Sequence, residues 1–345
     1  MKSHLTALAL AAGLITQETA AQDLSKAEEF AARGVAAALN DYPGYASLCN
    51  LETRIRNVNL PRDQRARPSA DGHAHGDQGS RPQRKDRPAP LRIPPTQVFD
   101  NLWFLGMAST TTWLYGTEDG YVLIDGLNTD AEAQEYVLDG MTEAGLDTSA
   151  IKAILVTHGH GDHYGGADYL SETLGVEILM TQEDWDLVAT LGDHPRFGPP
   201  PAKGGTVQDG EVLRFGTSEI QIHVTPGHTP GTVSPVFELF DGDTRHAAML
   251  WGGTGFNFGP DPEIFRSYAA SAQKMRRISK NMGVDVFLSG HPGRDGTVHL
   301  LDTLKDRTPG GPHPFVRGAS GYALFDVLEN CALAQAARFE AVPSE

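Results

Sequence analysis

One short segment, Thr157–His163 (T-H-G-H-G-D-H), constrains this chain more than any other. It directly follows an apolar run (I-K-A-I-L-V) that is typical of a buried strand. Three imidazoles and a carboxylate within six residues are all metal ligands by type, and the glycines between them let the backbone turn sharply around a cation. The segment therefore predicts a metal-binding loop at a strand end. His158 and His160 could hold one metal, and Asp162 and His163 could reach a second.

Two later histidines stand in a matching context. His228 lies in T-P-G-H-T-P-G after an expected strand at 220–224, and His291 lies in S-G-H-P-G after an expected strand at 284–288. Taken singly, each has a structural explanation. Because each strand runs out into a Gly/Pro turn, both could meet the first loop at one edge of a sheet. Together they would complete two sites with three protein ligands and an open position each, which a catalytic zinc needs.

The rest of the chain alternates between the two hydrophobic periods. Apolar runs and period-two alternation predict strands at 98–105, 111–115, 120–125, 151–157, 176–180, 211–215, 220–224, 233–239, 247–251 and 284–288. Helical spacing predicts helices at 23–39, 131–144, 167–173, 262–281 and 322–339. This order predicts a mixed α/β chain, and no internal repeat is evident.

Taken together, these motifs resemble those of the metallo-β-lactamase superfamily, over about residues 96–300 from N-L-W-F-L-G through L-I-D to H-P. The resemblance implies an α/β fold, the four-layer αββα sandwich, with metals between the two sheet edges. It implies a first zinc site made of His158, His160 and His228. It implies a second zinc site made of Asp162, His163 and His291. It also implies that Asp125 orients a metal-bound histidine and fixes its tautomer.

The sequence departs from the family after the expected strand at 247–251. Many superfamily hydrolases, including glyoxalase II-like thioesterases, lactonases and tRNA-processing nucleases, place a metal-bridging Asp there, and one lactamase subclass has Cys. This chain has Gly252–Gly255 (G-G-T-G). An Asp-His-His second site without a bridging ligand is most similar to the third subclass of metallo-β-lactamases. That subclass usually has a serine near this point, which is absent here.

The resemblance implies a hydrolase with two zinc ions. Zinc lowers the pKa of bound water to about 7 and so supplies a nucleophile at neutral pH. Asp162 is the ligand able to orient that water and pass on its proton, so we expect it to be catalytic. We expect the enzyme to open a strained cyclic amide similar to a β-lactam. A lactonase or esterase on the same metals is an alternative, and a non-catalytic zinc-binding protein is another.

Candidate substrate contacts lie at the end of the expected strand at 247–251 and just after it. Trp251, Thr254, Phe256 and Asn257 could line the pocket, although core packing is an alternative for Trp251. The charge favours a small-molecule substrate. The chain carries 28 Lys and Arg against 44 Asp and Glu, a formal net charge of −16, and the 61–92 stretch is itself basic. Such an acidic body should repel nucleic acid at long range.

The N-terminus predicts export. Residues 1–21 combine Lys2, an apolar run at 5–15 and a small-residue site before Gln22, which is typical of a secretory signal peptide. An N-terminal amphipathic helix is the alternative. The apolar run is too short for a span of about 20 residues, so we expect no membrane anchor and a periplasmic or secreted protein.

The remaining chain divides by composition into an arm and a catalytic domain. Residues 22–95 are predicted to form a helix and a Pro/Gly/Arg-rich linker, and residues 96–345 the catalytic domain with its C-terminal helix. His73–Asp77 mimics the metal loop but lies in the linker. Cys49 and Cys331 could form a disulfide between the arm and the C-terminal helix in an oxidising compartment, and two separate buried thiols are the alternative.

Overall fold

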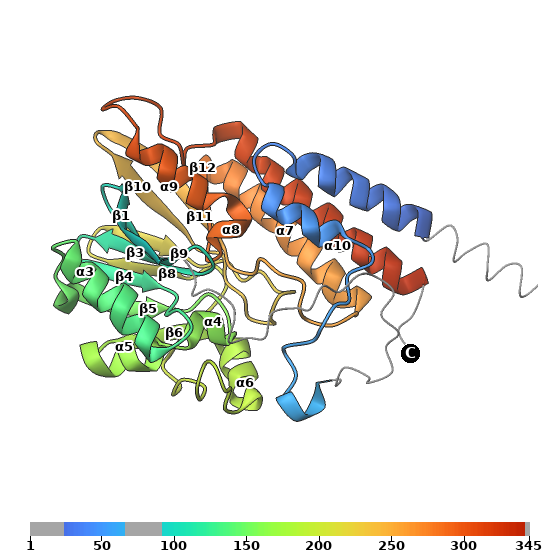
Figure 1. Cartoon of the computed structure of the whole chain (residues 1–345), viewed down its shortest axis with the longest axis horizontal. Coiled ribbons are helices and arrows are strands. Elements are labelled where there is room, and N and C mark those ends of the chain that lie inside the picture. Colours follow the sequence, from blue (N-terminus) through green and yellow to red (C-terminus); the bar gives the residue numbers. More distant parts are fainter. Residues whose placement is uncertain (1–23, 66–91, 342–345) are drawn as a thin grey trace, which may run out of the picture.

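The computed structural model describes residues 24–65 and 92–341 of the chain (Figure 1). The expected signal peptide at 1–21 and the His73–Asp77 motif lie outside the described residues. Two sheets face each other in the middle of the molecule, and helices cover both outer faces. The predicted α/β fold, a four-layer αββα sandwich, is therefore confirmed.

The first sheet has seven strands in the order β1-β2-β3-β4-β5-β6-β7. Its strands are β1 (Arg92–Phe99), β2 (Leu102–Met107), β3 (Thr111–Thr117), β4 (Gly120–Ile124), β5 (Ile151–Leu155), β6 (Glu177–Thr181) and β7 (Gly205–Val207). Neighbouring strands are antiparallel from β1 to β4 and parallel from β4 to β7.

The second sheet has five strands in the order β12-β11-β10-β9-β8. Its strands are β8 (Val212–Phe215), β9 (Ser218–Gln221), β10 (Val236–Asp241), β11 (Thr244–Trp251) and β12 (Val284–Ser289). The pair β11 and β12 is parallel, and the other pairs are antiparallel.

Helices of the first outer layer connect strands of the first sheet along the chain and pack on its outer face. They are α2 (Asp130–Glu132), the π-helical turn η4 (Ala133–Leu138), α3 (Asp139–Glu143), α5 (Ala167–Leu174) and α6 (Gln182–Leu191). The other outer layer contains α7 (Pro262–Met282), α10 (Ala323–Ala341) and a helix over residues 24–38, as predicted. Short helices η5 (Thr148–Ala150), α8 (Pro292–Asp295), α9 (Thr297–Lys305) and η6 (Gly318–Tyr322) lie in connections.

Period-two alternation builds the layers. In β3, Trp113 packs between the two sheets, whereas the next residue, Leu114, packs against the helices outside the first sheet. In β11, Leu250 faces the space between the sheets, and Trp251 faces the helices outside the second sheet. Each sheet therefore buries both faces, which explains why the strands read as nearly continuous apolar runs.

The sandwich brings several strand ends to one edge. Asp125 follows β4, the 158–163 loop follows β5, Gly252–Gly255 follows β11 and His291 follows β12. Because β4 and β5 are parallel, and so are β11 and β12, the carboxyl ends within each pair lie side by side. The predicted ligands therefore meet at this edge.

Several sequence predictions need correction. The strands expected at 220–224 and 233–239 are β9 (Ser218–Gln221) and β10 (Val236–Asp241), so His228 lies seven residues beyond the end of its strand. The expected strand at 98–105 is a hairpin, because Asp100 and Asn101 form the turn between β1 and β2. Since β1 begins at Arg92, the expected domain start at residue 96 falls inside a strand.

The N-terminal segment packs on the body of the protein. Tyr42 and Tyr45 are fully buried against α7 and α10, and the helix η1 (Pro43–Cys49) ends at a disulfide between Cys49 and Cys331 of α10. A Cβ added at Gly34 would lie 2.3 Å from the Sγ atom of Cys49, so the absence of a side chain lets the N-terminal helix contact this disulfide. The described part of the arm is thus integrated into the fold.

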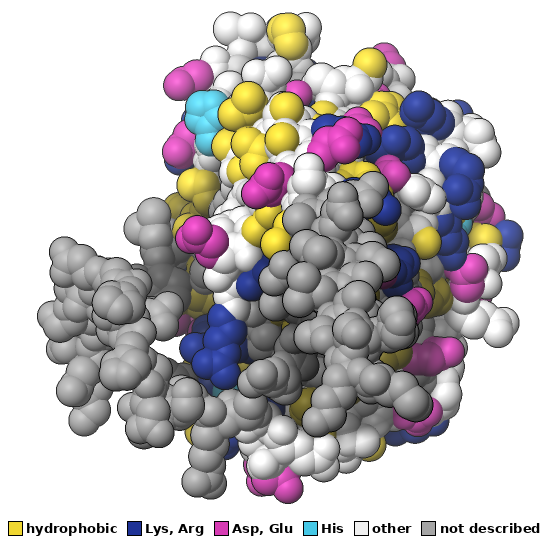
Figure 2. Space-filling model, turned by 90° about the vertical axis from the view of Figure 1, so that its right-hand side faces the viewer, with side chains coloured by type: hydrophobic (Ala, Val, Ile, Leu, Met, Phe, Trp, Pro, Cys, Tyr) yellow, Lys and Arg dark blue, Asp and Glu magenta, His cyan; other side chains and the backbone are white. Residues whose placement is uncertain are grey.

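The surface mixes both signs of charge. On the face shown in Figure 2, Lys and Arg side chains lie beside Asp and Glu side chains over the coloured area. Such mixing is typical of a solvated protein surface. Among the described residues, no helix is long and apolar enough to cross a membrane.

We expect the disulfide to stabilise the fold. Replacing Cys331 with Ser should lower the free energy of unfolding by about 2–4 kcal/mol, because it frees the arm in the unfolded chain. Urea unfolding with and without reductant measures this effect. In reductant the wild-type protein and the Cys331→Ser variant should have similar stability, whereas a wild-type stability that reductant leaves unchanged would contradict the prediction.

Candidate metal centre

The six predicted ligands come together as two groups of three. His158, His160 and His228 form the first triad, and Asp162, His163 and His291 form the second triad; within each, the ligand atoms lie within 4.8 Å of one another. The Nε2 atom of His228 lies 3.0 Å from His158 Nε2 and 3.0 Å from His160 Nδ1. In the second triad, His163 Nε2 lies 3.1 Å from His291 Nε2. The Asp162 Oδ2 atom is 3.9 Å from the former and 3.8 Å from the latter.

Each imidazole has its other ring nitrogen at a fixed protein oxygen. In the first triad, His158 Nδ1 lies 3.1 Å from Thr157 Oγ1, His160 Nε2 lies 2.6 Å from Asn59 Oδ1, and His228 Nδ1 lies 2.7 Å from the Gly255 carbonyl oxygen. In the second triad, His163 Nδ1 lies 2.7 Å from Asp125 Oδ2, and His291 Nδ1 lies 3.0 Å from the Ser109 carbonyl oxygen. These oxygens accept the ring N–H, so the lone pair of the other nitrogen points into the triad. Three lone pairs converge within the first triad and two, beside the Asp162 carboxylate, within the second, and each set fits a metal cation such as zinc.

Burial keeps the first triad neutral. It lowers the pKa of His158 and of His228 well below the ordinary value and lowers the pKa of His160 to about 4. A neutral imidazole is the form that binds a metal. At neutral pH the three rings therefore have their lone pairs available.

The second triad is more strongly charged. Burial opposes charge on His163, but Asp125 and Asp162 outweigh it and raise the pKa of this imidazole. Burial also opposes charge on Asp162, but His163 and His291 hold the pKa of that carboxyl well below its usual range. Asp162 is therefore ionised at neutral pH and can act as a ligand or accept a proton.

Asp125 links the strand ends beneath the two triads. Its Oδ1 accepts the Thr157 N–H at 2.7 Å, and its Oδ2 accepts from the Thr157 hydroxyl at 3.1 Å and from His163. Its backbone has φ 71°, which is unusual for a residue with a side chain, and Thr112 Oγ1 donates to its carbonyl oxygen. The surrounding hydrogen bonds thus hold a strained conformation that places this carboxylate against His163.

Asp184 was missed by the sequence analysis. It lies in the first turn of α6, where an acid is usual for capping, so its position gave no hint of another role. Its carboxylate is fully buried and accepts from Gly159 N at 2.8 Å, Thr229 Oγ1 at 2.6 Å and Gly231 N at 2.8 Å. Burial raises the pKa of this group to about 6. Asp184 therefore ties together the two loops that carry the first triad.

Asn59 was also missed, because the expected arm gave no reason to place it near the metals. Its Oδ1 faces His160, and its Nδ2 donates to the carbonyl oxygen of His228 at 2.9 Å. One amide thus contacts two residues of the first triad. The only sequence hint is that the arm is long enough to return to the sheet edge.

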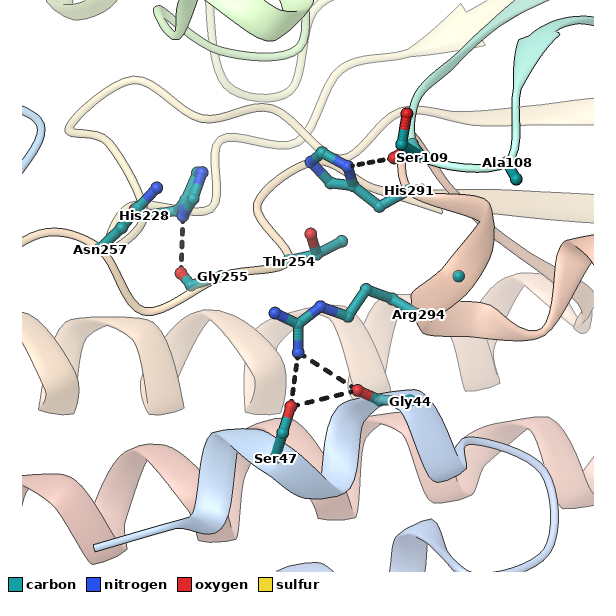
Figure 3. Close-up of a pocket in the computed structure, with 11 residues that line it drawn as sticks. Gly44, Ser47, Ala108, Ser109, His228, Thr254, Gly255, Asn257, His291 and Arg294 are labelled. Carbon is teal, nitrogen blue, oxygen red and sulfur yellow. Dashed lines mark hydrogen bonds between the residues drawn. The ribbon is translucent and has the colours of Figure 1, made fainter. Parts of the chain in front are cut away.

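A cavity of about 440 Å³ opens beside both triads (Figure 3). His228 and His291 line it, and so do two of the predicted substrate contacts, Thr254 and Asn257. A smaller cavity of about 230 Å³ lies against His160 and Asp162 and shares Asn257 with the first. The substrate side of the site therefore has two adjoining spaces.

Trp251 lies in the apolar core, which is the alternative that the sequence left open for it, and it does not contact the cavities. Its side chain is 1% exposed, packs on Tyr268, and donates its indole N–H to the Gly253 carbonyl oxygen at 2.7 Å. It points to the helical side of the sheet because of the strand alternation. Phe256 likewise packs against Phe265 in the apolar cluster between the second sheet and its outer helices, and it lines neither of the two cavities.

The Gly252–Gly255 segment leaves no room for a bridging ligand at Gly253. A Cβ added there would lie 2.4 Å from the Cβ of His228. The close approach of this backbone also lets the Gly255 carbonyl oxygen accept from the His228 ring. The glycines therefore replace a ligand-bearing side chain with a backbone contact that orients His228.

Known proteins share the fold and the motifs. A family model described as "Metallo-beta-lactamase superfamily" matches residues 105–291, more than half of the chain. Among solved structures, the native FEZ-1 metallo-β-lactamase from Legionella gormanii has a TM-score of 0.61 at 21% identity, over 71% of this chain and 95% of that one. BJP-1, a subclass B3 metallo-β-lactamase of Bradyrhizobium japonicum, has a TM-score of 0.57 at 22% identity, over 69% and 91% of the two chains.

Curated relatives that match part of the chain include hydroxyacylglutathione hydrolases. A hydroxyacylglutathione hydrolase of Anaeromyxobacter dehalogenans is 31% identical over 146 residues, 41% of this chain and 47% of the relative. The hydroxyacylglutathione hydrolase GloC of Haemophilus influenzae is 38% identical over 152 residues, 41% of this chain and 68% of the relative. The chain thus spans about half the length of the first of these relatives and two thirds of the second.

We expect Asp184 to preorganise the first triad. Asp184→Asn should weaken zinc binding by about 10- to 100-fold, because an amide has one acceptor oxygen and its NH2 group would face one of the three donors, such as the Gly231 N–H that Oδ1 now accepts. Competition with a chromophoric chelator measures the affinity. Asp186→Asn, two residues along α6 on an exposed side chain, is the control and should bind zinc as the wild type does. Equal affinities for the two variants would contradict this role.

We expect Asn59 to orient His160. Asn59→Leu should also weaken zinc binding, by about 10-fold or more, because it removes the acceptor that fixes the His160 tautomer. Asn59→Asp keeps that acceptor and should lose less. Isothermal titration with zinc compares both with Asn50→Leu, an exposed control in the same arm. The role is wrong if Asn59→Leu and Asn50→Leu bind zinc equally well.

Proposed function

The chain belongs to the metallo-β-lactamase superfamily, and on this premise we propose that it is a hydrolase that uses two zinc ions to open a strained cyclic amide such as a β-lactam. The observation that carries this proposal is the pair of facing triads, in which every imidazole is oriented by an acceptor on its outer nitrogen. His158, His160 and His228 would hold the first zinc. Asp162, His163 and His291 would hold the second.

Zinc in such sites supplies a nucleophilic water at neutral pH and polarises the carbonyl that is attacked. The protein residues contribute orientation and proton transfer. Asp162 lines the smaller cavity and its side chain is 32% exposed, so an ionised oxygen of this residue can orient the attacking water by accepting its proton. The same oxygen can then deliver that proton to the leaving nitrogen.

Residues of the larger cavity would position the substrate. The Thr254 hydroxyl and the Asn257 amide lie beside His228, where the carbonyl group would bind. The Oδ1 atom of Asn257 is buried and has no protein partner among the described residues.

Two comparisons support different substrates. The fold similarity to subclass B3 metallo-β-lactamases, together with the lack of a bridging carboxylate at Gly252–Gly255, favours a cyclic amide. The identity to hydroxyacylglutathione hydrolases favours a second candidate, hydrolysis of a thioester, lactone or other ester on the same metals. Both candidates use the same water and the same Asp162.

We further propose that the enzyme acts outside the cytoplasm, in the periplasm or as a secreted protein. The signal-like composition of residues 1–21 supports this, and so does the Cys49–Cys331 disulfide, because disulfides persist mainly in oxidising compartments. Its partner is then a small molecule that reaches that compartment.

Zinc-loaded protein should hydrolyse a chromogenic cephalosporin faster than a thioester or a lactone. Asp162→Asn should lower kcat by about 100-fold or more at equal zinc content, because an amide cannot accept the proton. Steady-state kinetics with metal analysis on each preparation measures this. The exposed control Asp130→Asn should keep wild-type kinetics.

Three outcomes decide between the proposals. Faster turnover of the thioester or lactone replaces the β-lactam assignment with the second candidate. Full activity of Asp162→Asn at unchanged zinc content would contradict the proposed role of Asp162 in proton transfer. Hydrolysis that a chelator does not inhibit sinks the zinc mechanism itself.

A further inference from the structure

Arg294 places a permanent positive charge in the cavity that both triads share. It follows His291 by three residues, on α8, and lines the 440 Å³ cavity together with His228 and His291. Figure 3 shows its side chain lying across the cavity between Thr254 and η1. None of the described residues that line this cavity is an Asp or a Glu. The guanidinium therefore has no carboxylate partner in the space where a substrate would bind.

The N-terminal arm holds this side chain in place. Nη1 of Arg294 donates to Ser47 Oγ at 2.8 Å and to the Gly44 carbonyl oxygen at 3.2 Å. A Cβ added at Gly44 would lie 2.4 Å from the Gly293 carbonyl oxygen, so the backbones of η1 and α8 are in direct contact there. The disulfide at Cys49 fixes the end of η1. Arg294 is thus ordered before any ligand binds, which reduces the entropic cost of binding.

The opposite edge of the guanidinium is free. All the protein hydrogen bonds of Arg294 within the described residues use Nη1, which leaves Nε and Nη2 without a protein acceptor. The two N–H groups of this edge are parallel and match the two oxygens of a carboxylate. The half-buried position makes such a pair stronger than it would be on an open surface.

We propose that Arg294 is a carboxylate-binding subsite that selects anionic acyl substrates. This inference rests on the proposed hydrolase function and adds the substrate class. A ligand with its carboxylate at Arg294 and its reacting carbonyl group at the triads fits within one cavity. With a net charge of −16, the protein as a whole does not attract anions, so an anionic ligand needs a local positive charge such as that of Arg294.

Matched pairs of ligands test the subsite. The first pair is a chromogenic cephalosporin with a free carboxylate and its methyl ester, compared by kcat/KM. The second pair is 3-mercaptopropionate and its methyl ester, whose thiols bind zinc without being hydrolysed, compared by Kd on the zinc-loaded protein. For both pairs the wild-type protein should prefer the anion by about 10- to 100-fold, the range expected of a hydrogen-bonded ion pair.

Variants assign that preference to Arg294. Arg294→Met should bring the preference close to 1, chiefly through a higher KM, whereas Arg294→Lys should keep part of it because the charge remains. Arg245→Met removes the same charge from an exposed side chain on β11 and should keep the full preference. Circular dichroism of each variant establishes that it is folded, and Arg294→Lys provides the test if Arg294→Met is not.

The outcomes separate the subsite from the proposed function. No preference in the wild-type protein overturns the subsite, and so does an unchanged preference in folded Arg294→Met and Arg294→Lys. Hydrolysis without anion preference overturns the subsite and leaves the hydrolase proposal intact. Anion preference in the thiol pair without hydrolysis of any substrate supports the subsite and overturns the hydrolase proposal.

Discussion

Five histidines must present a neutral, correctly aimed nitrogen in a buried space, and the rest of this structure depends on that constraint. A buried imidazole can direct a lone pair at a metal only if its other nitrogen carries the proton and has an acceptor. Here the acceptors come from separate parts of the chain: Asn59, Ser109, Asp125, Thr157 and Gly255. The site is therefore a property of the assembled fold, even though four of its six ligands lie in one short loop.

This need to orient the histidines explains three features of the structure, two of which lower the stability of the fold. Asp125 adopts a left-handed backbone conformation, which costs about 1–3 kcal/mol, and its carboxylate contacts both Thr157 and His163. Asp184 is buried as an acid and accepts from three groups on two loops. The arm crosses the molecule, is tied by the Cys49–Cys331 disulfide and delivers Asn59 to His160. In the first two cases stability is exchanged for the orientation of a ligand, whereas in the third the disulfide stabilises the arm that supplies the acceptor.

The candidate ligands were predictable from sequence, and most of the residues that orient them were not. The 158–163 loop carries its chemistry in residue types and spacing, and His291 closely follows the end of a predicted strand, whereas His228 lies seven residues beyond the end of β9. Asp125 was found through resemblance to a family motif. By contrast, Asn59 and Asp184 act through tertiary contacts. Asn59 contacts a residue 101 positions further along the chain, and Asp184 contacts residues that are 25 to 47 positions away from it. No local sequence pattern encodes such contacts. For Trp251 the sequence left two roles open, because strand alternation decides which face of the sheet it takes and the register was not known beforehand.

The central claim is that two preorganised triads each bind one metal ion. Metal analysis after dialysis against zinc tests it most directly, on the wild-type protein, His160→Ala in the first triad and His163→Ala in the second. The account predicts two zinc ions per wild-type chain, as in two-metal hydrolases, and about one in each variant. A wild-type chain that retains no zinc, or variants that retain as much zinc as the wild type, would contradict it.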